Sequence, residues 1–200
     1  MPFIETISPE TADGAARELT DGDAAAMGYL PNYTRLFAQR PEVYQAWKQL
    51  NGAIKAGMDP RRYELATIAA ARRLRSTYCM LAHSTVMINA LDVDPDAMRA
   101  IVVDPRTEAL DETERAIMDL ADRVVVDATA VTEADIDRLR ELGLTDGEIL
   151  DVILAATARC FFSKTLDAAG VEADARYASL EPDLRDALTV GRPIETAARP

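Results

Sequence analysis

Helix start and stop signals recur along the chain and constrain its fold more than any other feature. Aspartate precedes proline at Pro60 and Pro95, where the carboxylate can cap a helix and proline fits its first turn. Helical patterns end at Gly143 and Gly170, as is usual for helix C-termini. No stretch shows the sustained alternation of apolar and polar residues that is typical of half-buried strands. The sequence therefore predicts an all-α protein.

The helical pattern divides the chain into a long domain and a short remainder. A single helical domain is expected over 1–175, whereas 176–200 lose the pattern and are expected to form a C-terminal tail or arm. Segments at about 60–75 and 77–91 are separated by only a few residues, so they should pack as a central antiparallel helix pair. The other expected helices cover 9–27, a short stretch ending near 40, 41–56, 95–103, 111–128, 132–143 and 145–170.

Charge and cysteine content exclude several classes of protein. The chain has 34 acidic and 22 basic residues and a formal charge of -12, so nucleic acid and anionic membrane surfaces would be repelled. We find no apolar span and no signal-peptide pattern, and therefore expect a cytoplasmic protein. Because there are two cysteines and one histidine, neither a disulfide framework nor a multi-histidine metal site is expected, and no cofactor is predicted.

The single histidine lies four residues after a cysteine, in the segment STYCMLAHSTVM. In a helix this spacing places Cys79 and His83 on one face, which is otherwise apolar. Burial alone makes a thiol unreactive, but an adjacent imidazole can accept its proton and stabilise the thiolate. The imidazole in turn needs an orienting partner, usually a carboxylate. Glu64 begins the apolar run of the preceding helix, and we predict a proton relay of Glu64, His83 and Cys79.

Spacing alone leaves a structural alternative open. Free cysteine is among the most buried residue types, and a lone buried histidine is usually a hydrogen-bonded part of the core. On spacing alone this alternative is favoured over the relay.

The order and spacing of these residues resemble the signature of the alkylhydroperoxidase D (AhpD)-like, carboxymuconolactone decarboxylase superfamily. That signature is a glutamate, eleven residues, Cys-x-x-Cys, three residues and a histidine, and here it would run from Glu64 to His83. The segment GYLPNYTRLFAQRPEVYQAWKQL resembles the Gly-x-x-Pro-Asn region of the family. FFSKTLDAAGVEAD resembles the closing helix of the peroxidase-related branch, with Ser163 and Lys164 where Asn and Arg are usual. The resemblance covers about 25–175.

This resemblance implies an AhpD-like multi-helix bundle, a homo-oligomer (often a trimer or hexamer) and thiol peroxidase activity. Cys79 would correspond to the second motif cysteine, which the relay activates. A small hydroperoxide would be the substrate, and the enzyme would be a peroxidase- or peroxiredoxin-like oxidoreductase.

The first motif position departs from the family pattern, because Ser76 stands where a cysteine is usual. No disulfide can then form within the motif, so one-cysteine chemistry with an external thiol reductant is expected. Ser76 could instead hydrogen-bond the Cys79 thiolate or cap the following helix. Cys160 is a weaker candidate for a resolving thiol, and a plain core thiol is the better interpretation of it. Tyr78 could line a pocket, although aromatics at helical spacing are usually core.

Three functions remain open from the sequence. The first is the one-cysteine peroxidase. The second is a lyase or decarboxylase of a lactone or keto acid, with His83 and Glu64 as acid and base; members of that kind typically lack the motif cysteine. The third is a non-catalytic oligomeric protein that keeps the fold.

Overall fold

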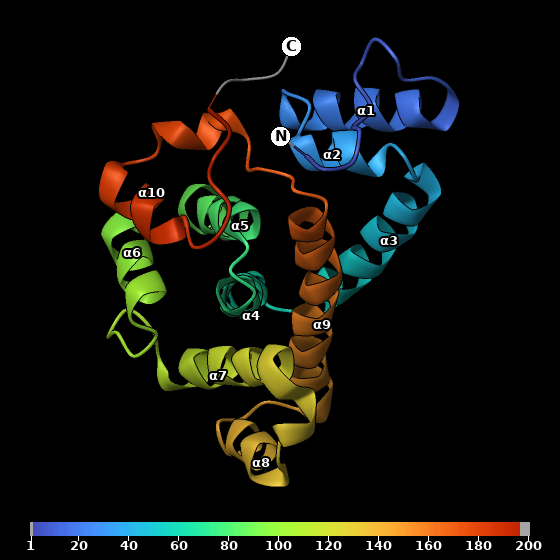
Figure 1. The fold of residues 1–200 in the computed structure, drawn as a ribbon. Helices are drawn as coiled ribbons and strands as arrows, with labels where there is room; N and C mark the ends of the chain where they lie inside the picture. Colours follow the sequence, from blue (N-terminus) through green and yellow to red (C-terminus); the bar gives the residue numbers. More distant parts are fainter. Residues whose placement is uncertain (1, 197–200) are drawn as a thin grey trace.

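Helices form almost all of the regular structure in the computed structural model, which describes residues 2–196 (Figure 1). Within that range the one β-bridge is an isolated parallel pair between Ala173 and Ile194. The α-helices are α1 (Gly14–Met27), α2 (Asn32–Phe37), α3 (Pro41–Gly57), α4 (Pro60–Arg73), α5 (Thr77–Ala90), α6 (Pro95–Val103), α7 (Glu112–Asp127), α8 (Glu133–Glu141), α9 (Asp146–Ala168) and α10 (Pro182–Leu188). Two 3-10 segments, Ala128–Ala130 and Ala175–Ser179, complete the set. The all-α prediction is confirmed.

Helix α4 is the centre of the bundle. It packs against α5, α7 and α9, and Figure 1 shows it end-on with these three helices around it. Every residue from Tyr63 to Ala71 is buried. Alanines supply much of this stretch, and their small side chains let three neighbouring helices approach closely. A polar side chain on this part of α4 is therefore forced into the protein interior.

Most helix boundaries lie within about two residues of the predicted ones, and α1 is the main exception. It begins at Gly14 rather than near residue 9. The carbonyl oxygen of Ser8 accepts hydrogen bonds from the backbone N–H groups of Thr11 and Ala12, at 3.1 and 3.0 Å. The extended backbone of Asp13, at φ -137° and ψ 169°, separates this turn from α1, so the turn and the helix are not continuous.

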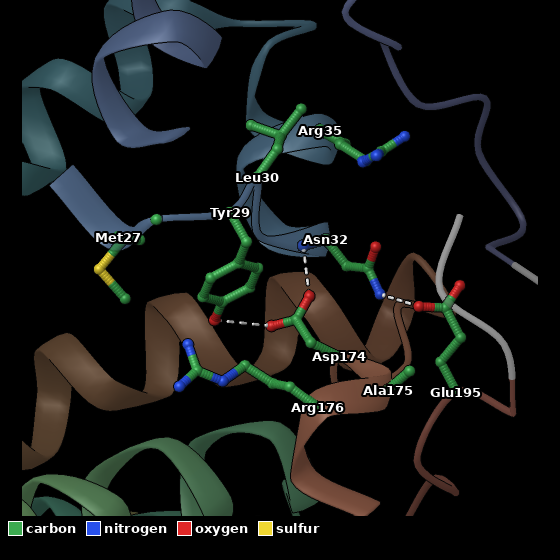
Figure 2. A pocket seen from close by; sticks show the side chains of 10 residues that line it. Met27, Tyr29, Leu30, Asn32, Arg35, Asp174, Ala175, Arg176 and Glu195 are labelled. Atoms are coloured by element: carbon green, nitrogen blue, oxygen red, sulfur yellow. Dashed lines mark hydrogen bonds between the residues drawn. The ribbon is translucent and has the colours of Figure 1, made fainter. Parts of the chain in front are cut away.

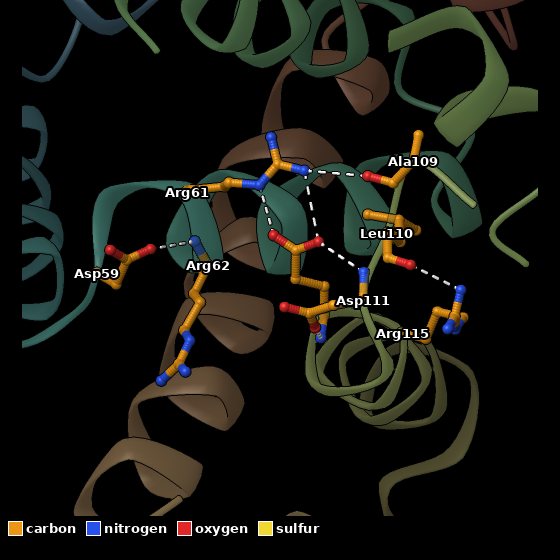
Figure 3. A network of polar contacts seen from close by, with 8 residues as sticks. Asp59, Arg61, Arg62, Ala109, Leu110, Asp111 and Arg115 are labelled. Carbon is orange, nitrogen blue, oxygen red and sulfur yellow. Dashed lines mark hydrogen bonds and ion pairs between the residues drawn. The ribbon is translucent and has the colours of Figure 1, made fainter. Parts of the chain in front are cut away.

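A polar network fixes the start of α7 against α4 (Figure 3). Asp111 and Glu114 form a capping box, in which each side chain accepts a hydrogen bond from the backbone N–H of the other residue. Arg61 of α4 donates to the Glu114 carboxylate and, at 3.3 Å, to the carbonyl oxygen of Ala109. Because one carboxylate serves both the cap and the arginine, the network sets the position of α7 relative to α4.

The C-terminal segment after residue 175 packs onto the bundle as an arm. Helix α10 lies against α6 and α5, with Leu184 and Leu188 buried. The chain then crosses the start of α5, where the N–H of Gly191 donates to the Thr77 hydroxyl at 2.8 Å. A Cβ on Gly191 would lie 1.9 Å from the carbonyl oxygen of Arg75, so only glycine permits this approach.

Two consequences of the architecture bear on function. The arm crosses the turn that contains Ser76, whose exposed fraction is 0%. Within residues 2–196, no helix has the length and apolar character needed to cross a membrane.

Removing the buried anchor of the arm should destabilise the whole domain. We expect Leu188→Ala to lower the free energy of unfolding by about 2–5 kcal/mol, because Leu188 is 0% exposed. Val126→Ala, at a side chain that is 61% exposed, is the control and should change it by less than about 0.5 kcal/mol. Urea denaturation followed by circular dichroism measures both. Equal effects would show that the arm contributes no stability.

Candidate active site

Glu64 and His83 are joined by a hydrogen bond between α4 and α5. The Glu64 side chain is 3% exposed, and its Oε2 atom lies 2.5 Å from His83 Nδ1. Lys55 of α3 places its Nζ 3.7 Å from Glu64 Oε1. The structure thus brings together the carboxylate and imidazole that the sequence predicts as partners, because the loop between α4 and α5 has only three residues, 74–76.

The environment of the pair determines its protonation state. Burial acts to raise the pKa of Glu64, but His83, Lys55 and Arg159 outweigh it and hold this pKa below its ordinary value. Burial lowers the pKa of His83 and the positive charge of Arg159 adds to the effect, which Glu64 only partly opposes. The state that follows is an ionised carboxylate and a neutral imidazole. Since a carboxylate can only accept, Nδ1 carries the hydrogen and Nε2 is left as a base.

The sulfur of Cys79 has donors from α9 rather than from its own helix. Cys79 is 2% exposed. The Ser163 hydroxyl donates to Sγ at 3.1 Å, and Arg159 Nη1 lies 3.6 Å away. Among the described residues, His83 forms no hydrogen bond to this sulfur, although it lines the same cavity. Cys79 and His83 thus share a cavity wall without a hydrogen bond between them, and the relay to Cys79 remains a prediction.

A cavity of about 170 Å³ connects these groups. Cys79, His83, Lys55, Arg159 and Asn51 supply its polar surface. Aromatic side chains from several helices form the rest of the wall, namely Tyr33, Tyr44, Trp47, Tyr63, Tyr78 and Phe162. This cavity is partly open to solvent, mostly apolar and provided with a few converging polar groups, as is usual for sites that bind small molecules.

Ser76 does not contact the sulfur of Cys79. It occupies the N-cap position of α5, but its side chain makes no capping hydrogen bond there. Neither of the two interactions considered for it from the sequence is formed. Ser163 takes the place at the sulfur instead, and the sequence showed Ser163 only as a departure from a family pattern.

Tyr78 contributes its ring to the cavity, while its hydroxyl points to another group. That hydroxyl donates to Asp174, whose carboxylate also accepts from the Tyr29 hydroxyl at 3.2 Å and the Asn32 N–H at 2.8 Å. Figure 2 shows the Tyr29 and Asn32 bonds at a second pocket, of about 530 Å³, beside Asp174 and Arg176. Asp174 thus holds Tyr78 in place from outside the cavity.

Cys160 is not part of the cavity wall. Both cysteines are free, and Cys160 is partly buried, one residue beyond Arg159 on α9. Burial raises the pKa of its thiol, which Lys164 only partly opposes. Its use as a resolving thiol remains a prediction. Within the described part of the chain, no cluster of three histidine, cysteine or acidic side chains could hold a metal ion.

The all-α bundle is the fold of AhpD-core structures. Three solved structures share the fold. The AhpD-core, peroxidase-related protein from Ralstonia eutropha JMP134 has a TM-score of 0.79 and 20% identity, over 88% of this chain and 94% of its own. The peroxidase-related protein from Silicibacter sp. TM1040 has a TM-score of 0.76 and 20% identity, over 89% and 96%.

The third structure is a cysteine-to-alanine variant of the debrominase Bmp8 in complex with 2,3,4-tribromopyrrole. Its TM-score is 0.70 and its identity 15%, over 93% of this chain and 95% of its own. The Carboxymuconolactone decarboxylase family matches residues 41–122, which include Glu64, Cys79 and His83. The segment matches that family, and the chain has an AhpD-like fold, as the sequence predicted. No curated protein matches the sequence.

The neutral state of His83 can be tested through stability, because this is the only histidine in the chain. Its pKa is lowered on folding, so the unfolded chain takes up the proton first and stability is lost as the pH falls through the unfolded value. We expect the difference in unfolding free energy between wild type and His83→Gln to shrink between about pH 7.5 and about pH 5.5, by at most about 1.4 kcal/mol per pH unit. Urea denaturation at both pH values measures it.

A difference that instead grows as the pH falls would mean that folding favours the imidazolium. His83 and Glu64 would then form a stable ion pair in the resting protein.

Proposed function

We propose that the protein is a one-cysteine, thiol-dependent peroxidase that reduces small hydroperoxides at Cys79. One observation carries the proposal. Cys79 lines a cavity together with His83, whose ring is hydrogen-bonded to Glu64, and the Cys79 sulfur has two hydrogen-bond donors, Ser163 and Arg159, directed at it. A sulfur with donors and a nearby base is the arrangement that activates a cysteine nucleophile.

The first step is removal of the thiol proton. His83 Nε2 accepts it through a water molecule, since the cavity has room for several waters and, among the described residues, no hydrogen bond joins the two side chains. Glu64 stabilises the imidazolium that forms. Arg159 and Ser163 offer their N–H and O–H groups to the negative sulfur, and hydrogen bonds to ionised groups are the stronger ones.

The second step transfers oxygen. The thiolate attacks the terminal oxygen of the hydroperoxide, an S–O bond forms, and the O–O bond breaks. The alkoxide leaves and takes the proton from His83, giving an alcohol and Cys79 sulfenic acid. Two equivalents of an external thiol then return the sulfenic acid to the thiol, with release of water and a disulfide. An external reductant is needed because Ser76 supplies no thiol and Cys160 does not line the cavity.

The fold does not decide among chemistries, since proteins of one fold carry different activities. A lyase would need Glu64 and His83 but not Cys79. A protein without catalytic activity would not need His83 and Cys79 to line the same cavity. The donors that Ser163 and Arg159 direct at the sulfur favour thiol chemistry over both.

We also propose that the protein is a homo-oligomer, as a trimer or hexamer. Exposed apolar side chains support this proposal. Leu150, Leu154 and Phe161 follow one face of α9 and are 53%, 36% and 44% exposed. Exposed apolar side chains that share one face of a helix are typical of subunit contacts.

The peroxidase proposal predicts where oxidation occurs. We expect an organic hydroperoxide to convert Cys79 to a sulfenic acid, which a sulfenic-acid reagent traps and mass spectrometry locates. His83→Ala and Glu64→Gln should slow the trapping at least about tenfold, the usual size of one acid–base contribution. Cys160→Ser is the matched control and should be trapped at the rate of the wild type. If Cys79 stays reduced under excess hydroperoxide, the proposal is wrong.

The role of Ser163 can be separated from that of the base. Ser163→Ala removes the donor at 3.1 Å from the sulfur without touching the Glu64–His83 pair. In this variant we expect the rate constant for Cys79 oxidation to fall about tenfold. This factor corresponds to the roughly 1.4 kcal/mol that one hydrogen bond to a charged group contributes. Stopped-flow measurement of single turnover gives this rate. Ser76→Ala, beside no substrate group, should leave it unchanged.

A further inference from the structure

Two buried N–H groups in the cavity wall have no acceptor in the described part of the protein. They are Nε of Arg159 and Nε1 of Trp47. Arg159 is 3% exposed, so water does not satisfy it from the outer surface. Buried polar groups are almost always hydrogen-bonded, and an exception requires an explanation. Both groups are donors only, so the missing partner must be an acceptor.

The positive charge of Arg159 also lacks a carboxylate partner among the described residues. Its other two nitrogens contact the Cys79 sulfur at 3.6 Å and the Tyr63 hydroxyl at 3.4 Å. The distance to Tyr63 is long, and within residues 2–196 Arg159 forms no ion pair with a carboxylate. The Glu64 carboxylate is occupied by His83 and Lys55, at 2.5 and 3.7 Å.

A buried charge without a counter-ion is costly, and a guanidinium cannot avoid that cost by losing its proton. Lys55 adds a second cation at the same cavity, with a side chain that is 48% exposed. The polar part of the cavity therefore favours an anion.

The rest of the cavity favours a flat apolar group. Trp47 and Phe162 stack with ring centroids 4.3 Å apart, and Tyr44 stacks with Trp47 at 6.0 Å. Aromatic side chains bind other rings through offset or edge contacts. The volume of about 170 Å³ is below the usual range for drug-sized ligands, so the occupant is small.

We propose that this cavity binds small aromatic carboxylates, with Arg159 and the Trp47 N–H holding the carboxylate and the aromatic wall holding the ring. If the protein is the peroxidase proposed above, its preferred substrate is then a hydroperoxide that carries a carboxylate. The binding site itself does not depend on peroxidase turnover. Arg159 acts as a specificity residue because it would contact the bound carboxylate and already contacts the Cys79 sulfur.

Benzoate and benzamide test the proposal, because they share shape and differ in charge. The only tryptophan in the chain lines the cavity, so its fluorescence reports binding, and titration calorimetry measures the affinity independently. We expect the wild type to bind benzoate at least about tenfold more tightly than benzamide. The same preference is expected in Cys79→Ser, in which a thiolate cannot compete for Arg159.

Variants identify the residues that hold the carboxylate. Arg159→Gln should reduce benzoate affinity at least about tenfold, and Lys164→Gln, on the same helix but exposed, should not change it. Trp47→Phe keeps a ring and removes the N–H, and calorimetry should show a loss of several-fold. If Arg159→Gln does not fold, Trp47→Phe and Arg159→Lys test the same contacts to the carboxylate.

Equal affinity for benzoate and benzamide, or no benzoate binding by either wild type or Cys79→Ser, would overturn the proposal. The two proposals fail in different ways. Benzoate binding without Cys79 oxidation would reject the peroxidase and keep the carboxylate site. Cys79 oxidation without benzoate binding would reject the carboxylate site and keep the peroxidase.

Discussion

The hydrogen bond between Glu64 and His83 depends on how α4 is buried, and the rest of the site depends on that bond. α4 is enclosed by α5, α7 and α9, so a carboxylate on it has little access to solvent. Such a group needs partners inside the protein. His83 and Lys55 supply them, and the hydrogen bond in turn fixes which nitrogen of His83 is the base.

Helix α9 completes the site from the opposite side. Arg159 and Ser163 are four residues apart, so both project from one face of the helix toward the Cys79 sulfur. The neighbouring Cys160 points along a different direction, which is why a residue adjacent in sequence to Arg159 has no place in the cavity. The cavity is thus lined by His83, which is hydrogen-bonded to Glu64, and by the positively charged side chain of Arg159.

The C-terminal arm closes the other side of the motif. It crosses the turn between α4 and α5, and the bond from Gly191 to Thr77 holds it there. Ser76 lies in this turn and has no exposed surface. A thiol at that position would be covered too, so both the residue type and its burial favour one-cysteine chemistry. The tail expected from the sequence is, over the residues described, this packed arm.

The sequence by itself determined the helical class, most helix boundaries and the partnership of Glu64 with His83. These follow from local signals, namely capping residues, glycine stops and fixed spacing across a short loop. Only the tertiary structure decided what surrounds the Cys79 sulfur. Arg159 and Ser163 are 80 and 84 residues from it in the chain, and no local periodicity reports a contact at that separation. Their placement follows from the packing of α9 against α4, which fixes their direction as well as their distance.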